Sequence, residues 1–230
     1  MLAELLGIGA YRSYTAKLGD DTAAILWGRR PTASGKEVNE DTATNIAAVF
    51  NAVTLISDAA KVLPLFLYER LANNGGKRAA TQHPVYRLLH RRPNVEMSPA
   101  RFKKLLVSWA LLWGSGPAEI ERNGAGQPIN LWPIHPRNRR KVRSDTGELV
   151  HLVRGSDAQQ TLIADADVLE LIGYTKDGVN GVSIIGMARE SLGVAIAAEE
   201  YAGAFFAKDA APNIVLKHPR RLDDAAQRRI

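Results

Sequence analysis

The sequence SIIGMARESLGVAIAAEEYAGAFFA, residues 183–207, can run as one helix of 25 residues. At 1.5 Å per residue such a helix is about 38 Å long, and Ser183 is a suitable N-cap for it. Its middle, residues 191–198, is uncharged and made mostly of small side chains. Other helices can approach such a surface closely from more than one side, so we expect this helix to pack against helical neighbours.

The segment before this helix begins with an amphipathic helix. Asp41 can cap it, its apolar residues recur at spacings of three and four, and it is expected to end before Pro64. The apolar residues of the face expected to be buried are Ile46, Val49, Phe50, Val53 and Ile56. Residues 63–68 then indicate a short buried strand, which the turn sequence at residues 73–76 ends.

Two further helices are predicted in the middle of the chain. The first covers residues 84–90, and the second begins at Pro99, behind the cap Ser98. Gly114 stands where this second helix needs a left-handed closing residue.

Strands dominate the next part of the chain. Between residues 118 and 154, turn signals at Asn123-Gly124 and at residues 145–147 predict a small antiparallel sheet. Residues 168–172 add one strand, and the turn Asp177-Gly178 leads into the long helix. The combined pattern predicts a mixed α+β fold.

The two ends of the chain are less regular. Residues 1–40 show no sustained period and finish in a polar stretch, which is typical of a flexible arm. Residues 213–217 return to a strand pattern. Residues 222–230 begin a helix within which the sequence stops.

The composition is that of a globular chain, with 46% hydrophobic and 23% charged residues among 230. The absence of cysteine excludes disulfides, thiolate metal sites and a cysteine nucleophile. Glu4 stands where a signal peptide carries a basic residue, and the uncharged runs 42–57 and 105–118 are shorter than a bilayer span. We expect neither a secretion signal nor a membrane segment.

Motifs for catalysis or cofactor binding are weak. The Gly-Lys pairs at residues 35–36 and 76–77 lack the spacing of a phosphate loop, and Ser183 fits a helix cap better than a nucleophile elbow. Histidines at positions 83, 90, 135, 151 and 218 lack zinc-site spacing. Asp165 and Asp167 can bind a divalent ion as a pair, although a solvated turn is commoner. We expect no enzymatic activity, no cofactor and no metal.

The formal charge of +6 favours acidic or phosphate partners only weakly. The sharpest basic run is residues 137–143, which can contact phosphates or form the solvated edge of a sheet. Its basic surface candidates are Arg137, Arg139, Arg140, Lys141 and Arg143. A second cluster, which contains Lys217, Arg220 and Arg221, follows the long helix.

The order and spacing of ten short stretches resemble the head-to-tail portal proteins of tailed bacteriophages, in the family found in long-tailed phages, prophages and gene transfer agents. These stretches are residues 45–60, 63–68, 83–89, 92–94, 119–120, 131–136, 167–169, 198–202, 205–207 and 212. Two positions depart from the family pattern: Ser115-Gly116-Pro117 replaces an Asn-Ala-Tyr segment, and no proline follows Ser183.

The resemblance implies a ring, usually of twelve subunits, at one capsid vertex. Double-stranded DNA passes through such a ring during packaging and ejection. The implied partners are the terminase large subunit, the head-tail adaptor and the major capsid protein, with no membrane. The implied location is the virion, with host cytoplasm during assembly.

The resemblance also implies a domain order. Residues 1–40 correspond to an N-terminal arm, 41–180 to a wing-like α+β domain, 181–212 to a stem helix and 213–230 to the start of a clip, with the C-terminal part of the family absent. The channel or stem-packing candidates are Arg189, Glu190, Glu199, Glu200 and Tyr201. Lys217, Arg220 and Arg221 are the candidates for partner docking at the clip. The alternative is a monomeric basic DNA-binding module.

Overall fold

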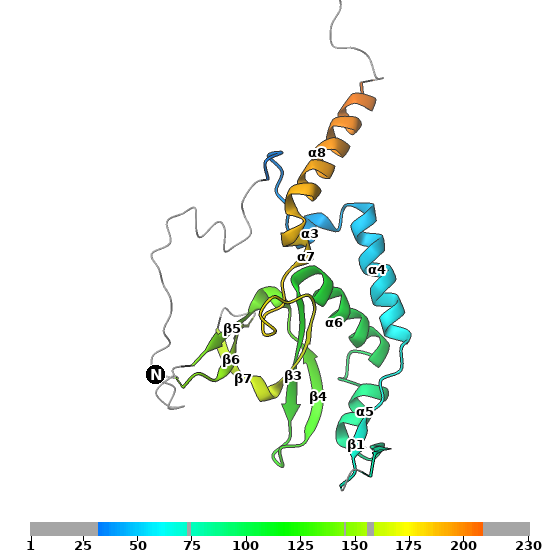
Figure 1. Cartoon of the computed structure of the whole chain (residues 1–230), viewed down its shortest axis with the longest axis vertical. Coiled ribbons are helices and arrows are strands. Elements are labelled where there is room, and N and C mark those ends of the chain that lie inside the picture. The colour runs from blue at the N-terminus through cyan, green and yellow to red at the C-terminus, as the bar shows by residue number, and fades with distance from the viewer. Residues whose placement is uncertain (1–31, 73–74, 145, 156–158, 209–230) are drawn as a thin grey trace, which may run out of the picture.

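The computed structural model describes residues 32–72, 75–144, 146–155 and 159–208. Helices and short antiparallel strands form a body from which one helix, α8 (Arg189–Phe206), projects (Figure 1). The mixed α+β class predicted from the sequence is confirmed. Within the described ranges, no helix is both long enough and apolar enough to cross a bilayer.

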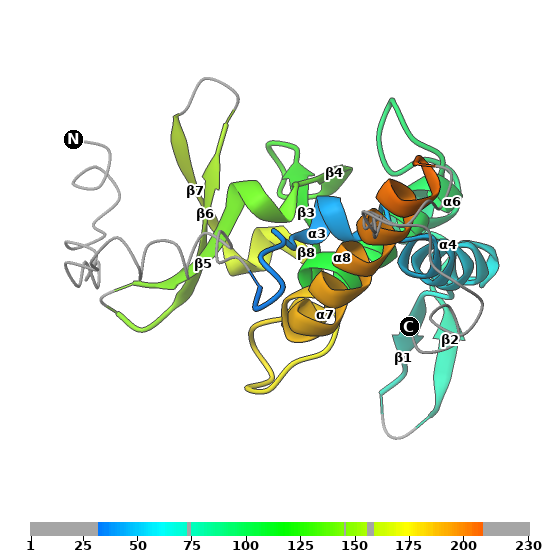
Figure 2. The ribbon, with the colours of Figure 1, turned by 90° about the horizontal axis from the view of Figure 1, so that it is seen from above.

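The first helical region is two helices, where the sequence predicted one. Helix α3 (Glu40–Ala43) is capped by Asn39, whose side chain accepts hydrogen bonds from the amides of Asp41 and Thr42. The prediction of Asp41 as the cap is therefore wrong, because the cap is Asn39, two residues earlier, which forms a reciprocal capping box with Thr42. Helix α4 (Ala47–Val62) follows and runs beside α6 (Pro99–Trp113), as both Figure 1 and Figure 2 show.

The predicted apolar face of α4 is only partly buried. Ile46 is buried, Val49 and Val53 are half-buried, and Phe50 and Ile56 are exposed. The apolar spacing predicted the helix correctly, but the chain covers only one side of it.

The predicted buried strand at residues 63–68 is wrong. Only Tyr68 belongs to a strand, β1 (Tyr68–Arg70), which pairs with β2 (Lys77–Ala79) in a two-stranded hairpin. Residues 63–67 lie between α4 and β1 and belong to no sheet, and Phe66 is 66% exposed. An apolar run shows that a segment favours burial, but not what buries it.

The two middle helices are confirmed. Helix α5 (Pro84–His90) is capped by His83, and α6 is capped by Ser98 and closed by Gly114 in the left-handed conformation, with φ 87°. Helix α6 buries Phe102 and Leu106 in a core that also contains Leu88, Ala118 and Leu131.

Six strands form two antiparallel three-stranded sheets, where the sequence predicted one small sheet. The first, in the order β4-β3-β8, contains β3 (Ser115–Arg122), β4 (Pro128–Pro133) and β8 (Val168–Ile172). The second, in the order β5-β6-β7, contains β5 (Arg139–Arg143), β6 (Leu149–Arg154) and β7 (Gln160–Ala164). Strand β8 returns from the second sheet to pair with β3, a long-range pairing that turn signals do not reveal.

Gly116 explains one departure from the family pattern. A Cβ atom added there would lie 2.2 Å from the carbonyl oxygen of Leu106, so β3 packs directly against the backbone of α6. Gly181 approaches Gly114 even more closely, with 1.7 Å between its ideal Cβ position and the Gly114 oxygen. Larger residues at these positions cannot fit this packing.

The predicted helix at residues 183–207 is broken. Helix α7 (Ile184–Met187) and α8 are separated by Ala188, with φ −90° and ψ 11°. Ser183 caps α7 as predicted, and Ile185 is buried with Val38, Ala43 and Leu112. This packing holds α7 against the body, and the change of direction at Ala188 lets α8 project from it.

The end of the predicted flexible arm is packed against α8. Residues 32–38, here called the strap, place Val38 in the core at 3% exposure, and the amide of Ala33 donates a 2.9 Å hydrogen bond to Glu190. Residues 1–31 lie outside the described residues. So do the predicted strand at 213–217 and the helix at 222–230.

Candidate functional site

One face of α8 is covered by the strap. Glu190, Gly193 and Glu200 lie three and seven residues apart and therefore share a side of the helix. Ala33 bonds to Glu190, Lys36 pairs with Glu200, and the Thr32 side chain lies where a Cβ on Gly193 would stand. Two of the predicted channel or stem-packing residues, Glu190 and Glu200, are thus engaged within the subunit.

The sequence pattern did not reveal the strap. Glycine at position 193 was the available signal, because a small residue on a helix face permits close approach by another segment. It does not say which segment approaches. Of the remaining candidates, Arg189 is half-buried, whereas Glu199 and Tyr201 are exposed.

A different side of α8 carries exposed apolar side chains. Val194, Tyr201 and Phe205 follow one another at spacings of seven and four, so they form a stripe along the helix. Phe206 is also exposed, and its ring contacts that of Phe205 from the adjoining side of the helix. Tyr201 is 75% exposed. Other parts of the described chain leave this stripe open, which suits packing against another helix or another subunit.

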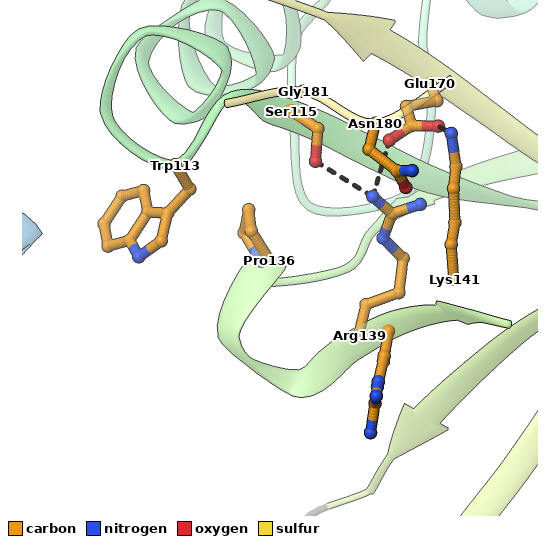
Figure 3. Close-up of a pocket in the computed structure, with 9 residues that line it drawn as sticks. Trp113, Ser115, Pro136, Arg139, Lys141, Glu170, Asn180 and Gly181 are labelled. Atoms are coloured by element: carbon orange, nitrogen blue, oxygen red, sulfur yellow. Dashed lines mark hydrogen bonds and ion pairs between the residues drawn. The ribbon is translucent and has the colours of Figure 1, made fainter. Parts of the chain in front are cut away.

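Two members of the predicted basic surface are buried. Arg139 and Lys141 point to the same side of β5, toward Glu170 on β8, and all three side chains are at most 9% exposed. The Arg139 guanidinium lies 2.5 Å from Glu170 and 2.9 Å from Ser115, and Lys141 pairs with the other oxygen of Glu170 (Figure 3). Their assignment as surface residues is therefore wrong, because strand alternation turns every second residue inward.

This ion cluster joins the two sheets. Lys141 also donates a 2.6 Å hydrogen bond to the carbonyl oxygen of Val179. Burial raises the pKa of Glu170, but hydrogen bonds and charges from Lys141 and Arg139 outweigh burial, so the pKa lies below its ordinary value. A charged Glu170 between two cations holds β5 against β8.

His151 extends the cluster from the buried side. Its Nδ1 lies 2.7 Å from the Arg139 guanidinium and its Nε2 lies 2.8 Å from Asp165, which assigns the proton of the neutral ring to Nε2. Burial lowers the pKa of His151, while the hydrogen bond to Asp165 opposes this effect and the Arg139 charge adds to it. The neutral ring is therefore favoured.

A pocket of about 360 Å³ opens beside the cluster (Figure 3). Its lining includes Trp113, Pro136, Arg139, Lys141 and Glu170. Arg139, Lys141 and Glu170 bind each other in this lining, which also contains the exposed Arg140, so the pocket lies at the contact between the two sheets.

The rest of the basic run is dispersed. Arg137 pairs with Asp41 at 2.5 Å, and Arg140 and Arg143 are exposed on β5. Among the described strands, β5 pairs with β6 alone, so it is an edge strand. The solvated edge of a sheet was one of the two alternatives predicted for residues 137–143, the other being contact with phosphates. The exposed arginines do not form a continuous stripe with Arg139 and Lys141.

The other polar candidates have structural contacts. Asp165 contacts His151, whereas Asp167 lies 2.6 Å from Arg122, so the two carboxylates serve different partners. Among the described residues, no group of three or more His, Asp and Glu side chains could hold a metal ion.

Ser183 and His135 are also accounted for by packing. The Ser183 hydroxyl lies 2.6 Å from the Leu112 oxygen and 3.0 Å from Glu40, and it accepts from the Gly186 amide. His135 lies between Trp109 and Trp113, with ring centroids 5.1 and 4.9 Å apart. Lys217, Arg220 and Arg221 lie outside the described residues.

The fold and these contacts define a body held together by buried ion pairs, with one projecting helix. Comparison with known proteins gives the family. The family model described as Phage portal protein matches residues 47–230, and the chain belongs to this family of structural proteins.

One relative is the portal protein of Enterobacteria phage HK97, 30% identical over 173 residues. The match covers 75% of this chain and 40% of the relative, so the chain spans well under half of that protein.

Two solved structures share the fold. A chain in the virion of a native gene transfer agent particle matches with a TM-score of 0.60 and 20% identity, covering 90% of this chain and 57% of that chain. A chain in the neck of a native gene transfer agent particle, computed with C12 symmetry, matches with a TM-score of 0.58 and 18% identity, covering 99% and 57%.

Proposed function

We propose that this chain is a structural portal subunit, which forms a ring at one capsid vertex. The ring is the channel for packaging and ejection of double-stranded DNA and the platform for the packaging motor and tail adaptor. The observation that carries this proposal is the projecting helix α8 with its exposed apolar stripe, on a chain of the phage portal family. A stripe of this kind is suited to lateral packing in an assembly.

The domain assignment follows from the same proposal. Residues 41–180 form the wing and α8 belongs to the stem, within the proposed range 181–212. The strap is the end of the N-terminal arm and braces the stem helix through Glu190 and Glu200. We assign residues 213–230, which lie outside the described residues, to the start of the clip, and we assign Lys217, Arg220 and Arg221 to partner docking there on the basis of their charge.

Glu199 is the acidic stem residue that we assign to the channel or to a neighbouring subunit, because it is exposed and the strap does not contact it. A channel that lets DNA slide needs few strong phosphate contacts, since each neutralised phosphate adds attraction that must be broken at every step. An acidic side chain is compatible with this requirement.

The proposed assembly is a homo-oligomer, with twelve copies as in the C12 neck of the gene transfer agent. Its proposed partners are double-stranded DNA, the terminase large subunit, the head-tail adaptor and the major capsid protein. The proposed location is the portal vertex of the virion, with host cytoplasm during assembly. No enzymatic activity or cofactor is part of this role.

Light scattering coupled to size exclusion, with negative-stain imaging of large species, tests the ring. We expect particles with a central hole and a mass near a multiple of the 25.1 kDa subunit. A chain that remains a 25.1 kDa monomer at all concentrations contradicts ring formation by these residues.

The alternative, a monomeric DNA-binding module, makes a different prediction. Such a module should bind duplex DNA with an affinity that falls steeply as salt rises. We expect weak duplex binding, because Arg139 and Lys141 are buried against Glu170 and cannot reach phosphates. Tight, salt-sensitive binding by the monomer, lost when Arg140 and Arg143 are replaced by alanine, would favour the alternative.

A further inference from the structure

The segment between α4 and β1 has an open backbone. Residues 63–67 continue to β1 without entering a sheet, and only the two ends of this segment are paired. The Leu63 amide donates to the Ala60 oxygen, the Leu63 oxygen accepts from Lys103, and the Leu67 oxygen accepts from the Ala80 amide. Among the described residues, the amides and carbonyl oxygens of Leu65 and Phe66 have no hydrogen-bond partner. Unpaired backbone in an extended segment can accept another strand.

The side chains of this segment are apolar and exposed. Leu63, Leu65 and Phe66 face solvent, and the patch continues onto α4, where Leu55 and Val62 lie seven residues apart on one side of the helix. We call these five residues the α4–β1 surface. Apolar side chains beside unpaired backbone create an aggregation site unless another surface covers them.

The α4–β1 surface lies away from the stripe on α8. In Figure 1, α4 descends from the base of α8 to the hairpin of β1 and β2, while α8 extends in the opposite direction. A partner along the stem therefore does not account for the exposed residues near β1.

We infer that the α4–β1 surface is the contact for a second copy of this chain, which adds a strand to residues 63–67. This inference rests on the proposed ring. Neighbours in a closed ring meet through two different surfaces of the same chain, so the α4–β1 surface needs a complementary surface elsewhere on the subunit.

The outer edge of β8 has the matching chemistry. Among the strands of the described ranges, β8 pairs with β3 alone, and it exposes Leu169 and Leu171. The other edge strands of the two three-stranded sheets, β4, β5 and β7, expose no large hydrophobic residue. Pairing of the segment with β8 of the next copy satisfies the free backbone groups of Leu65 and Phe66 and buries leucines on both sides.

The variant Phe66→Asp tests the α4–β1 surface. A charge in the contact should raise the concentration needed for half-assembly by at least about tenfold, because truncating or charging a central aromatic anchor costs more than one decade of affinity. Val95→Asp is the matched control, since Val95 is 63% exposed but lies outside the surface. Both variants should keep the unfolding midpoint of the original chain. Equal assembly of the two variants overturns the inference.

Cysteine cross-linking tests the pairing itself, because the chain contains no cysteine. A mixture of Phe66→Cys and Leu171→Cys chains should form a disulfide-linked dimer on oxidation, and neither variant alone should do so. Cross-linking of Phe66→Cys with itself indicates a two-fold contact and overturns the inference. If rings form normally but no mixed cross-link appears, the inference is overturned and the proposed function is left intact. If the chain never assembles, both the inference and the proposed function are contradicted.

Discussion

At the residue scale, Glu170 is the side chain whose loss we expect to reduce the stability of the body most. It lies between Arg139 and Lys141 in a buried cluster, and each of its carboxylate oxygens has a cationic partner. Removing a buried charge from such a cluster leaves the remaining charges without compensation, which costs far more than losing an exposed ion pair.

Replacing Glu170 with glutamine should therefore reduce the free energy of unfolding by about 3–5 kcal/mol. Asp167→Asn is the matched control, because the Arg122–Asp167 pair is partly exposed, and it should cost less than about 1 kcal/mol. Urea titration followed by circular dichroism measures both changes. Similar small losses in the two variants would show that the cluster contributes little to stability.

His151 predicts a dependence of stability on pH. Because its folded-state pKa is lowered by burial, the unfolded chain binds a proton more readily once the pH falls below the ordinary value of about 6.5. The free energy of unfolding should fall with acidification there, by at most about 1.4 kcal/mol per pH unit for this group. Burial lowers the pKa of His135 as well, so this residue acts in the same direction.

The variant His151→Gln should show a weaker slope between about pH 6.5 and 5 than the original chain. A second loss is expected below about pH 4.3, where Glu170, whose folded-state pKa is lowered, begins to take up a proton in the unfolded chain. Unfolding curves recorded at pH values across both transitions measure the slope of the His151→Gln variant and the loss assigned to Glu170. An unchanged slope in His151→Gln would contradict the assignment of the upper transition.

At the scale of elements, the contact of the strap with α8 determines how the projecting helix is held. Gly193 is the point of closest approach, since an added Cβ would lie 2.4 Å from the Thr32 hydroxyl oxygen. Gly203, on the same helix, has no other group within 4 Å of its ideal Cβ position. Alanine at Gly203 therefore measures only the intrinsic cost of glycine in a helix, whereas alanine at Gly193 also measures the contact with the strap.

The variant Gly203→Ala should stabilise the chain by about 0.5–1 kcal/mol, because alanine is the better helix former. Gly193→Ala should instead destabilise it by about 1–3 kcal/mol, because the methyl group collides with Thr32. The double variant Thr32→Gly with Gly193→Ala should recover part of the loss. Thermal and urea unfolding measure these differences, and stabilisation by Gly193→Ala alone would mean that the strap is not seated as described.

At the scale of the whole molecule, apolar and charged groups have different roles. The buried charges join the two sheets, while many of the large exposed apolar residues lie on α8, on α4, along residues 63–66 and on β8. Association between copies should therefore depend mainly on apolar contact, which is not weakened by salt.

The fraction of assembled chain should stay constant or rise when salt increases from about 0.1 to 0.5 M, because screening at these concentrations affects exposed charges and not apolar burial. Sedimentation velocity across a salt series measures this fraction. Dissociation of the assembly by moderate salt would indicate that ionic contacts hold the subunits together.

The sequence alone determined the local elements and the class of protein. Helix α5 has the predicted bounds, and α6 begins and ends at its predicted caps, because capping and a left-handed glycine act within a few residues. The turns before β4 and β6 were predicted for the same reason. The portal resemblance also came from the sequence, since it depends on the order of short motifs.

Only the tertiary structure decided which surfaces meet. The break at Ala188, the strap on α8 and the pairing of Arg139 and Lys141 with Glu170 all join residues far apart in the chain, or depend on such contacts. Periodicity gives the side of an element on which a residue lies, but not the segment that covers that side. For the same reason, residues 63–68 showed the composition of a buried strand, while their exposure became visible only in the folded subunit.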